Sequence, residues 1–229
     1  MVNRQLSAVI PAAGIGKRVG ATIPKQYLSI LNRTIIEFSL APFLEHPEIQ
    51  RVVVSLAEND QWFASLPVAK HPKIETVIGG AERVDSVLAA LEKISSDDYV
   101  LVHDAARPCI TKHDIDKLIT AVKGQELGGI LASKVRDTMK RGDDHHRILT
   151  TVERNNLWHA LTPQMFINKS LINAIKENTQ PEKITDEASA LEMSGLPVNI
   201  IEGRSDNLKV TREEDLKLAA FYLSQGEVK

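Results

Sequence analysis

Short apolar runs typical of β-strands alternate with stretches of helical periodicity through most of this sequence. We expect strands at residues 6–10, 51–55, 74–78, 99–103 and 129–133. We expect helices between them at residues 35–44, 83–93 and 113–122, where apolar side chains recur every three or four positions. Nearly continuous apolar strands separated by helices are typical of a mainly parallel sheet covered on both faces. The pattern therefore predicts an α/β fold.

The length of 229 residues suits one large domain and is barely enough for two small ones. We therefore expect a single domain over residues 1–229. The 28 Lys and Arg residues nearly balance the 30 Asp and Glu residues, giving a formal net charge of −2. Because no long basic run is present, the sequence argues against a nucleic acid partner.

The N-terminal sequence gives no sign of export. The apolar run at residues 6–10 stops at Pro11, too early for the core of a signal peptide. No stretch approaches the roughly 18 apolar residues of a membrane helix, so we expect no membrane partner. The single cysteine, Cys109, excludes an internal disulfide and is read as a small packed side chain rather than a nucleophile. We expect a cytoplasmic protein.

Three of the predicted strands end in residues that suit a ligand better than a core. Residues 11–14, 79–80 and 104–107 read PAAG, GG and DAAR. In open α/β sheets ligands bind beyond the carboxyl ends of the strands. We therefore expect these three turns to converge on one crevice.

The loop after the first strand, residues 11–20, resembles two phosphate-binding loops and fits neither. A Walker A loop needs Gly and then Ser or Thr where this chain has Pro11 and Arg18. A dinucleotide fingerprint needs two residues between its last glycines, and here three intervene. Small residues with exposed amides remain, together with the cations Lys17, Arg18 and Lys25. We interpret this combination as a phosphate-binding loop.

The other two strand ends are open to a structural and a functional interpretation. The segment 79–87 is either an ordinary glycine turn or a close approach to a flat ligand, with the Ser86 hydroxyl available to that ligand. Asp104 and Arg107 either close a turn as an ion pair or handle hydroxyls, metal and phosphate. We read His103 as a structural histidine.

The segment 134–151 interrupts the alternation of strands and helices. It is polar and flanked by β-type stretches, which predicts a hairpin arm at about residues 134–155 with its turn near residues 141–144. A protruding two-stranded hairpin is only marginally stable alone. We therefore expect a second surface to hold it, most simply a second copy of the chain.

The motifs, taken together in their order, resemble the 2-C-methyl-D-erythritol 4-phosphate cytidylyltransferase family. They run from about residue 7 to residue 220. The matching segments are PAAGxGxR at 11–18, PKQY at 24–27, GG at 79–80 with Arg83 and Ser86, VHDAARP at 102–108, DT at 137–138, Arg154, LW at 157–158, TPQxF at 162–166, TDEA at 185–188, Gly203, Asn207, Lys209 and Thr211. The chain departs from the family at residues 32–34 and at Ala90, where glycine is common.

This resemblance implies a Rossmann-like three-layer α/β/α nucleotidyltransferase fold with a twisted, mainly parallel sheet. It implies transfer of CMP from CTP to the phosphate of methylerythritol phosphate, with release of pyrophosphate, in the non-mevalonate isoprenoid pathway. It also implies a homodimer that exchanges arms. Mg²⁺ or another divalent cation would be held mainly by the nucleotide phosphates, so we expect no dedicated metal site in the protein.

The resemblance also assigns site residues. The implied catalytic residues are Arg18, Lys25, Arg154 and Lys209. The implied nucleotide site comprises Pro11, Ala12, Ala13, Gly14, Gly16, Gly80, Ser86 and Asp104. The implied acceptor site comprises Asp104, Arg107, Thr138, Arg154, Thr162 and Lys209. Thr138 and Arg154 would act in the partner subunit's site.

Three alternatives remain at the level of sequence. A cytidylyltransferase for another polyol phosphate, above all ribitol 5-phosphate, shares the nucleotide motifs, and only Ala106 favours the methylerythritol type. An NAD-dependent dehydrogenase would also carry a glycine loop after its first strand, but the glycine spacing argues against it. A nucleotide-binding regulator without catalysis would be expected to lack at least one phosphate-handling cation, whereas Arg18, Lys25, Arg154 and Lys209 are all present.

Overall fold

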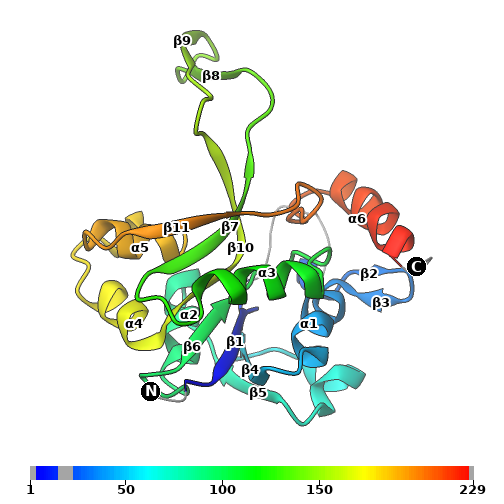
Figure 1. Ribbon diagram of the computed structural model, residues 1–229. Coiled ribbons are helices and arrows are strands. Elements are labelled where there is room, and N and C mark those ends of the chain that lie inside the picture. The colour runs from blue at the N-terminus through cyan, green and yellow to red at the C-terminus, as the bar shows by residue number, and fades with distance from the viewer. Residues whose placement is uncertain (1–3, 15–22, 227–229) are drawn as a thin grey trace.

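The computed structural model describes residues 4–14 and 23–226, and its centre is a seven-stranded sheet (Figure 1). The strand order is β11-β7-β10-β6-β1-β4-β5. The strands are β1 (Leu6–Pro11), β4 (Ile49–Leu56), β5 (Ile74–Ile78), β6 (Tyr99–Val102), β7 (Gly128–Lys134), β10 (Trp158–Ile167) and β11 (Val198–Glu202). β10 runs antiparallel to both of its neighbours, and the other pairings within this sheet are parallel. The predicted α/β class and mainly parallel sheet are confirmed.

Helices cover both faces of the sheet and give the fold three layers. They are α1 (Ile35–Glu45), α2 (Arg83–Leu91), α3 (Lys112–Val122), α4 (Asn168–Lys176), α5 (Glu187–Met193) and α6 (Glu213–Gly226). α1 and α3 pack in one core cluster, and α2, α4 and α5 pack in the other. Strand β1 contributes to both clusters: Ala8 and Ile10 face the first and Val9 faces the second, and all three are fully buried. A strand buried on both faces explains the continuous apolar run.

Side chains at the starts of several helices fix where those helices begin. Thr34 Oγ1 accepts from the Glu37 amide, and the Glu37 carboxylate accepts from the Thr34 amide, which makes a capping box before α1. Thr111 and Asp114 do the same before α3. Such reciprocal caps satisfy amides that would otherwise lack partners. They fix the first residues of α1 and α3.

The C-terminal segment returns to the sheet before it forms α6. The Val210 amide donates to the Ala106 carbonyl at 2.8 Å, which ties residues 207–211 to the turn after β6. α6 then packs with α1 and the small β2–β3 hairpin (Ser29–Ile30 and Arg33–Thr34). The remaining short elements are the 3₁₀ helices η2 (Lys25–Tyr27), η3 (Phe63–Ser65), η4 (Pro67–Lys70) and η5 (Pro181–Lys183).

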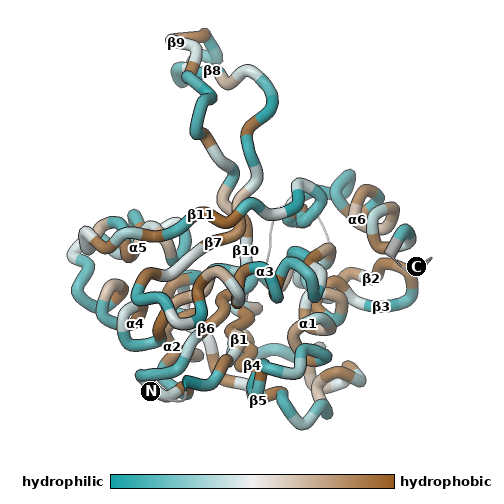
Figure 2. Tube along the Cα trace, in the orientation of Figure 1, coloured by the Kyte–Doolittle hydropathy of each residue, from teal (hydrophilic) through white to brown (hydrophobic). Residues whose placement is uncertain are grey.

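A hairpin arm leaves the body where β7 ends and β10 begins (Figure 1). Its strands are β8 (Met139–Gly142) and β9 (Ile148–Val152). The arm is largely hydrophilic in Figure 2, but Ile148 and Leu149 near its tip are 68% and 63% exposed. The turn lies at residues 143–147, later than the predicted 141–144, because the Asp143 carboxylate accepts from the amides of His145 and Arg147. Among the described residues, no helix is long and apolar enough to span a bilayer.

Candidate active site

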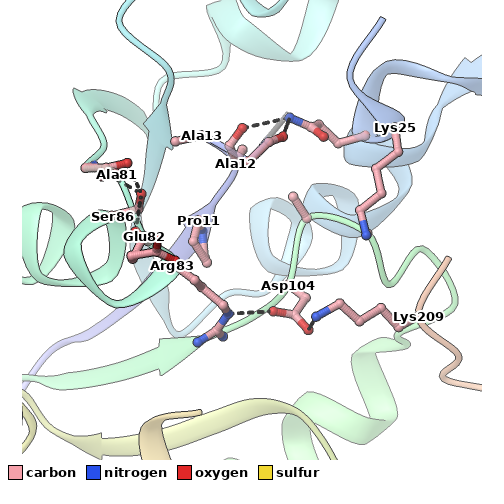
Figure 3. Close-up of a pocket in the computed structure, with 15 residues that line it drawn as sticks. Pro11, Ala12, Ala13, Lys25, Ala81, Glu82, Arg83, Ser86, Asp104 and Lys209 are labelled. Atoms are coloured by element: carbon pink, nitrogen blue, oxygen red, sulfur yellow. Dashed lines mark hydrogen bonds and ion pairs between the residues drawn. The ribbon is translucent and has the colours of Figure 1, made fainter. Parts of the chain in front are cut away.

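The three predicted strand ends converge on one crevice, as the sequence predicts (Figure 3). It is an open crevice with a volume of about 190 Å³. Its described lining comprises Pro11, Ala12, Ala13, Gly14, Lys25, Gln26, Gly80, Ala81, Glu82, Arg83, Ser86, Asp104, Ala105, Ala106 and Lys209. The crevice thus holds small residues on one side and charged groups on the other.

The turn after β1 forms the small-residue side. The Ala12 amide donates to the Ser55 carbonyl, and the buried Gln26 side chain donates to the carbonyls of Ala12 and Gly14 at 2.7 and 3.2 Å. Among the described residues, nothing lies within 4 Å of a Cβ added at Gly14. The predicted site residues Gly16 and Arg18, with Lys17, lie outside the described residues.

Lys25 enters the crevice from η2, directly after Pro24. Its Nζ donates to the Val210 carbonyl at 3.1 Å. Figure 3 shows the Lys25 ammonium group directed toward the side of the crevice where Asp104 and Lys209 lie. The structure therefore brings Lys25 and Lys209, far apart in sequence, to one space.

The glycine pair after β5 is required by packing inside the protein. A Cβ at Gly79 would lie 2.7 Å from the Ala13 Cβ and the Ser86 Oγ, and one at Gly80 would lie 2.2 Å from the Asp85 Cβ. The Ser86 hydroxyl is also engaged here, because it accepts from the Gly80 amide at 3.1 Å. Ser86 thus shapes the turn that lines the crevice, and its contact with a nucleotide stays a prediction.

Asp104 is the centre of the charged side, with its side chain 8% exposed. Its Oδ1 accepts from Arg83 Nε at 3.1 Å, and its Oδ2 lies 3.0 Å from Lys209 Nζ and 3.3 Å from Arg107 Nε. Burial alone would raise the pKa of Asp104. The charges of Arg83, Lys209 and Arg107 outweigh burial and hold that pKa well below its usual range. Asp104 is therefore ionised throughout the neutral range, and its Arg107 pair also closes the turn.

A second hollow, of about 240 Å³, adjoins the crevice at this ion cluster. Arg83, Asp104 and Lys209 line both spaces, and Arg107 and Thr162 line the hollow. Arg107 is held by the Asn207 carbonyl, which accepts from its Nη1 at 2.9 Å. Two ligands placed in the crevice and the hollow would meet at Asp104.

Thr162 supports this turn from β10. Its Oγ1 accepts from the Asp104 amide at 3.1 Å and lies 2.9 Å from His103 Nδ1. His103 Nε2 faces the Arg107 carbonyl, which only accepts, so Nε2 carries the proton and the Thr162 hydroxyl donates to Nδ1. The buried His103 is thus a structural residue, as the sequence indicates. Direct contact between Thr162 and substrate stays a prediction.

The pH dependence of stability should report on His103. Burial lowers the pKa of His103 to about 4. The unfolded chain, with a usual histidine pKa near 6.5, binds this proton first as pH falls. The neutral ring therefore contributes full stability above about pH 6.5, and up to about 3 kcal/mol is lost as pH falls through that value toward 4. The free energy of unfolding should be measured with urea for wild type and His103→Gln and plotted against pH. The two plots should converge as pH falls over this window. Parallel curves would contradict the assignment.

The two arm residues do not reach the crevice of their own chain. Thr138 and Arg154 are absent from the described lining of both the crevice and the hollow. Arg154 Nη1 instead donates to the Arg136 carbonyl across the base of the arm. This geometry is consistent with a role for Thr138 and Arg154 outside the site of their own chain, and that role stays a prediction.

The buried Cys109 is not a candidate nucleophile. Burial raises the pKa of the Cys109 thiol to about 12, so it is not a thiolate at neutral pH. Among the described residues, no three His, Cys, Asp or Glu side chains are grouped to hold a metal ion.

Sequence reasoning gave no role to three residues, of which two line the crevice and the third contacts one of those two. Arg83 and Glu187 occur in the motifs of the resemblance, and Gln26 follows Lys25, but nothing in their spacing shows what they contact. The Glu187 carboxylate is 3% exposed and accepts hydrogen bonds from the Arg83 guanidinium at 2.6 and 3.2 Å. A charged residue at the start of a helix is usually a solvated cap. Burial distinguishes Glu187 from such a cap, and the sequence does not show that burial.

Comparison with known proteins gives a consistent result over nearly the whole chain. The family model for 2-C-methyl-D-erythritol 4-phosphate cytidylyltransferase (IspD) matches residues 6–225. The protein of that name from Tolumonas auensis is 54% identical over 223 residues, which cover 97% of this chain and 98% of that one. Its namesake from Vibrio cholerae is 51% identical over 228 residues, covering 98% of each chain. The crystal structure of the Francisella tularensis protein of this name superposes with a TM-score of 0.82 at 35% identity, covering 95% of this chain and 99% of that one. This chain therefore belongs to the 2-C-methyl-D-erythritol 4-phosphate cytidylyltransferase family.

Proposed function

We propose that the crevice binds CTP, that the adjoining hollow binds 2-C-methyl-D-erythritol 4-phosphate, and that the acceptor phosphate attacks the α-phosphorus of CTP in line. Pyrophosphate leaves, and 4-diphosphocytidyl-2-C-methyl-D-erythritol forms. Family membership supports both substrates. The placement rests on one observation: Asp104, Arg83 and Lys209 line both spaces, so the two phosphates would meet there.

The chain needs no activated nucleophile for this reaction. A phosphate oxygen of the acceptor is already nucleophilic at neutral pH, and the obstacle is bringing two polyanions together. Cations fixed before the reaction stabilise the charge that develops on the transferred and leaving phosphates. We assign this task to Lys25 and Arg18 at the nucleotide and to Lys209 at the acceptor phosphate, with Arg107 beside it.

The small-residue side of the crevice suits the nucleoside. Backbone groups at residues 11–14 and Gly80 are free of bulky side chains and can approach a base and a ribose closely. We propose that this side reads cytosine largely through backbone groups and excludes purines by size. Ser86 keeps the Gly80 turn in place for that contact.

We further propose that the chain is a cytoplasmic homodimer in which each arm completes the partner's site. The arm projects from the body in Figure 1 and exposes Ile148 and Leu149. Exposed apolar side chains on an otherwise polar hairpin suit an interface. Exchange of arms would carry Thr138 and Arg154 to the partner's hollow.

A divalent cation fits this crevice as a companion of the nucleotide. Asp104 and Glu82 are carboxylates in its described lining, and Asp104 already accepts from three cations, so the nucleotide phosphates would supply most ligands. When bound, such a cation would neutralise triphosphate charge. We expect EDTA to reduce turnover by at least about 100-fold and excess Mg²⁺ to restore it. Full activity in EDTA would contradict the metal requirement.

A pyrophosphate-release assay tests the proposed function. CTP should support release with 2-C-methyl-D-erythritol 4-phosphate, whereas ATP, GTP and UTP should not. Ribitol 5-phosphate, run beside it, tests the alternative acceptor, because the nucleotide motifs do not distinguish the two. Faster release with ribitol 5-phosphate would overturn the acceptor assignment, and absence of release with either acceptor would overturn the transfer reaction.

A further inference from the structure

We propose that Glu187 is a positioning residue for this reaction, acting through Arg83 to fix Asp104 and the two cations that Asp104 holds. The proposal rests on the transfer reaction proposed above. It concerns a carboxylate that does not line the crevice or the hollow in the described structure. Glu187 would act without touching either substrate.

The Arg83 guanidinium is divided between two carboxylates. Its Nη1 and Nη2 donate to Glu187 Oε1 and Oε2 at 2.6 and 3.2 Å, a two-point clamp on one edge. Its Nε donates to Asp104 Oδ1 at 3.1 Å from another edge. Bidentate pairing of this kind fixes orientation as well as distance, because the guanidinium is planar and rigid. Glu187 therefore determines where Arg83 can meet Asp104.

The chain of ion pairs continues from Asp104 to the acceptor side. Asp104 Oδ2 lies 3.0 Å from Lys209 Nζ and 3.3 Å from Arg107 Nε. Figure 3 shows Arg83 and Lys209 reaching Asp104 from opposite directions. Four elements far apart in sequence are joined in this way: the start of α5, the start of α2, the turn after β6, and the segment before α6. A shift at the first pair is passed to Lys209 through Asp104.

The charges explain why a second carboxylate is needed. Arg83, Arg107 and Lys209 carry three positive charges, and Asp104 alone would balance one of them. Glu187 is 3% exposed, so its charge acts on Arg83 with little screening by water. Burial alone would lower the pKa of Arg83, but Glu187 and Asp104 raise it above its usual value, so Arg83 keeps its charge. Without Glu187, Arg83 would be free to turn toward a bound triphosphate.

This leads to a kinetic pattern that general damage would not produce. In Glu187→Gln the side chain keeps its size but loses its charge and its two-point clamp. We expect kcat to fall by about 10- to 100-fold, the range typical of an outer supporting carboxylate. The KM for CTP should stay unchanged or fall, because Arg83 becomes an additional cation for the triphosphate. A merely structural defect would raise KM or lower kcat only in proportion to the unfolded fraction.

Glu192→Gln is the matched control. Glu192 is exposed on the same helix, α5, and undergoes the same chemical change. We expect wild-type kinetics from it. In a Lys209→Ala background, Glu187→Gln should lower kcat by a smaller factor than it does in wild type, because the two residues act in one chain of contacts. Additive losses would overturn the relay from Glu187 to Lys209.

The assay separates this proposal from the function on which it rests. No pyrophosphate release by wild type or Glu192→Gln overturns both. Release by wild type with a Glu187→Gln kcat within about threefold of it overturns only the role of Glu187. If Glu187→Gln does not fold, Arg83→Lys provides the second test, since a lysine keeps the charge but cannot bridge both carboxylates. It should show the same fall in kcat without a rise in the KM for CTP, and a proportional rise in KM would overturn the proposal.

Discussion

Replacing Lys25 by alanine should slow turnover by at least about 100-fold while the affinity for CTP changes much less. The Lys25 Nζ is held at the crevice by the Val210 carbonyl, on the side where Asp104 and Lys209 lie. A cation fixed there interacts most strongly with charge that grows as the α-phosphorus is attacked. Losing one such preorganised group removes about 3 kcal/mol of transition-state stabilisation. The loss should therefore appear in kcat rather than in binding.

Single-turnover kinetics and a separate measurement of CTP binding would distinguish these effects. Lys112→Ala is a suitable control, because Lys112 is an exposed lysine at the start of α3. The sequence predicts the same result for Arg18→Ala, at a position outside the described residues. A turnover number within about tenfold of wild type for either variant would remove that residue from the catalytic set.

The sheet and the crevice could be predicted because their signals are local. The five predicted strands and three predicted helices all occur, with bounds shifted by at most a few residues. Each strand is a short apolar run, and the ends at residues 11–14, 79–80 and 104–107 meet because parallel strands end on one edge. The convergence of these strand ends therefore follows from the alternation of elements, without knowledge of any contact.

Strand direction could not be read in the same way. β10 is buried over much of its length, yet it runs antiparallel between β6 and β7. Its pairing with β7 also shifts register between Ala160 and Gln164. The spacing of apolar residues is the same whichever way a strand runs in the sheet, so it cannot distinguish an antiparallel strand from a parallel one. The strands predicted from the sequence included neither β10 nor β11.

The ion-pair cluster around Asp104 could not be predicted in full from the sequence, for a different reason. Asp104 and Arg107 are three residues apart, so the sequence could suggest their pairing. Glu187 and Arg83 are separated by 104 positions, and their contact depends on how α5 is placed against α2. For the glycine pair at residues 79–80 the sequence left an ordinary turn and a ligand contact open, and the structure adds that a Cβ at either glycine would clash with neighbouring side chains. Long-range contacts of this kind have no local signal.

Mixing two inactive variants should restore activity if the arm completes the partner's site. Lys25→Ala removes a cation of the body, and Arg154→Ala removes a residue of the arm, which projects from the body in Figure 1. A mixed dimer then has one site with both defects and one with neither. Random exchange of equal amounts makes half of the dimers mixed, so about a quarter of all sites should be intact. Neither variant alone can reach that level.

The measurement is pyrophosphate release after the two variants have been mixed and allowed to exchange subunits. Exchange is verified by recovering mixed dimers through an affinity tag carried by one variant only. Arg141→Ala, used in place of Arg154→Ala, is the matched control, because Arg141 is an exposed residue of the same arm. The Arg141→Ala protein should be active alone, and its activity should not depend on mixing. If Arg154 worked within its own chain, the mixed dimer would contain one site lacking Lys25 and another lacking Arg154. Activity would then stay at the level of the separate variants after verified exchange, and that result would contradict the exchanged arm.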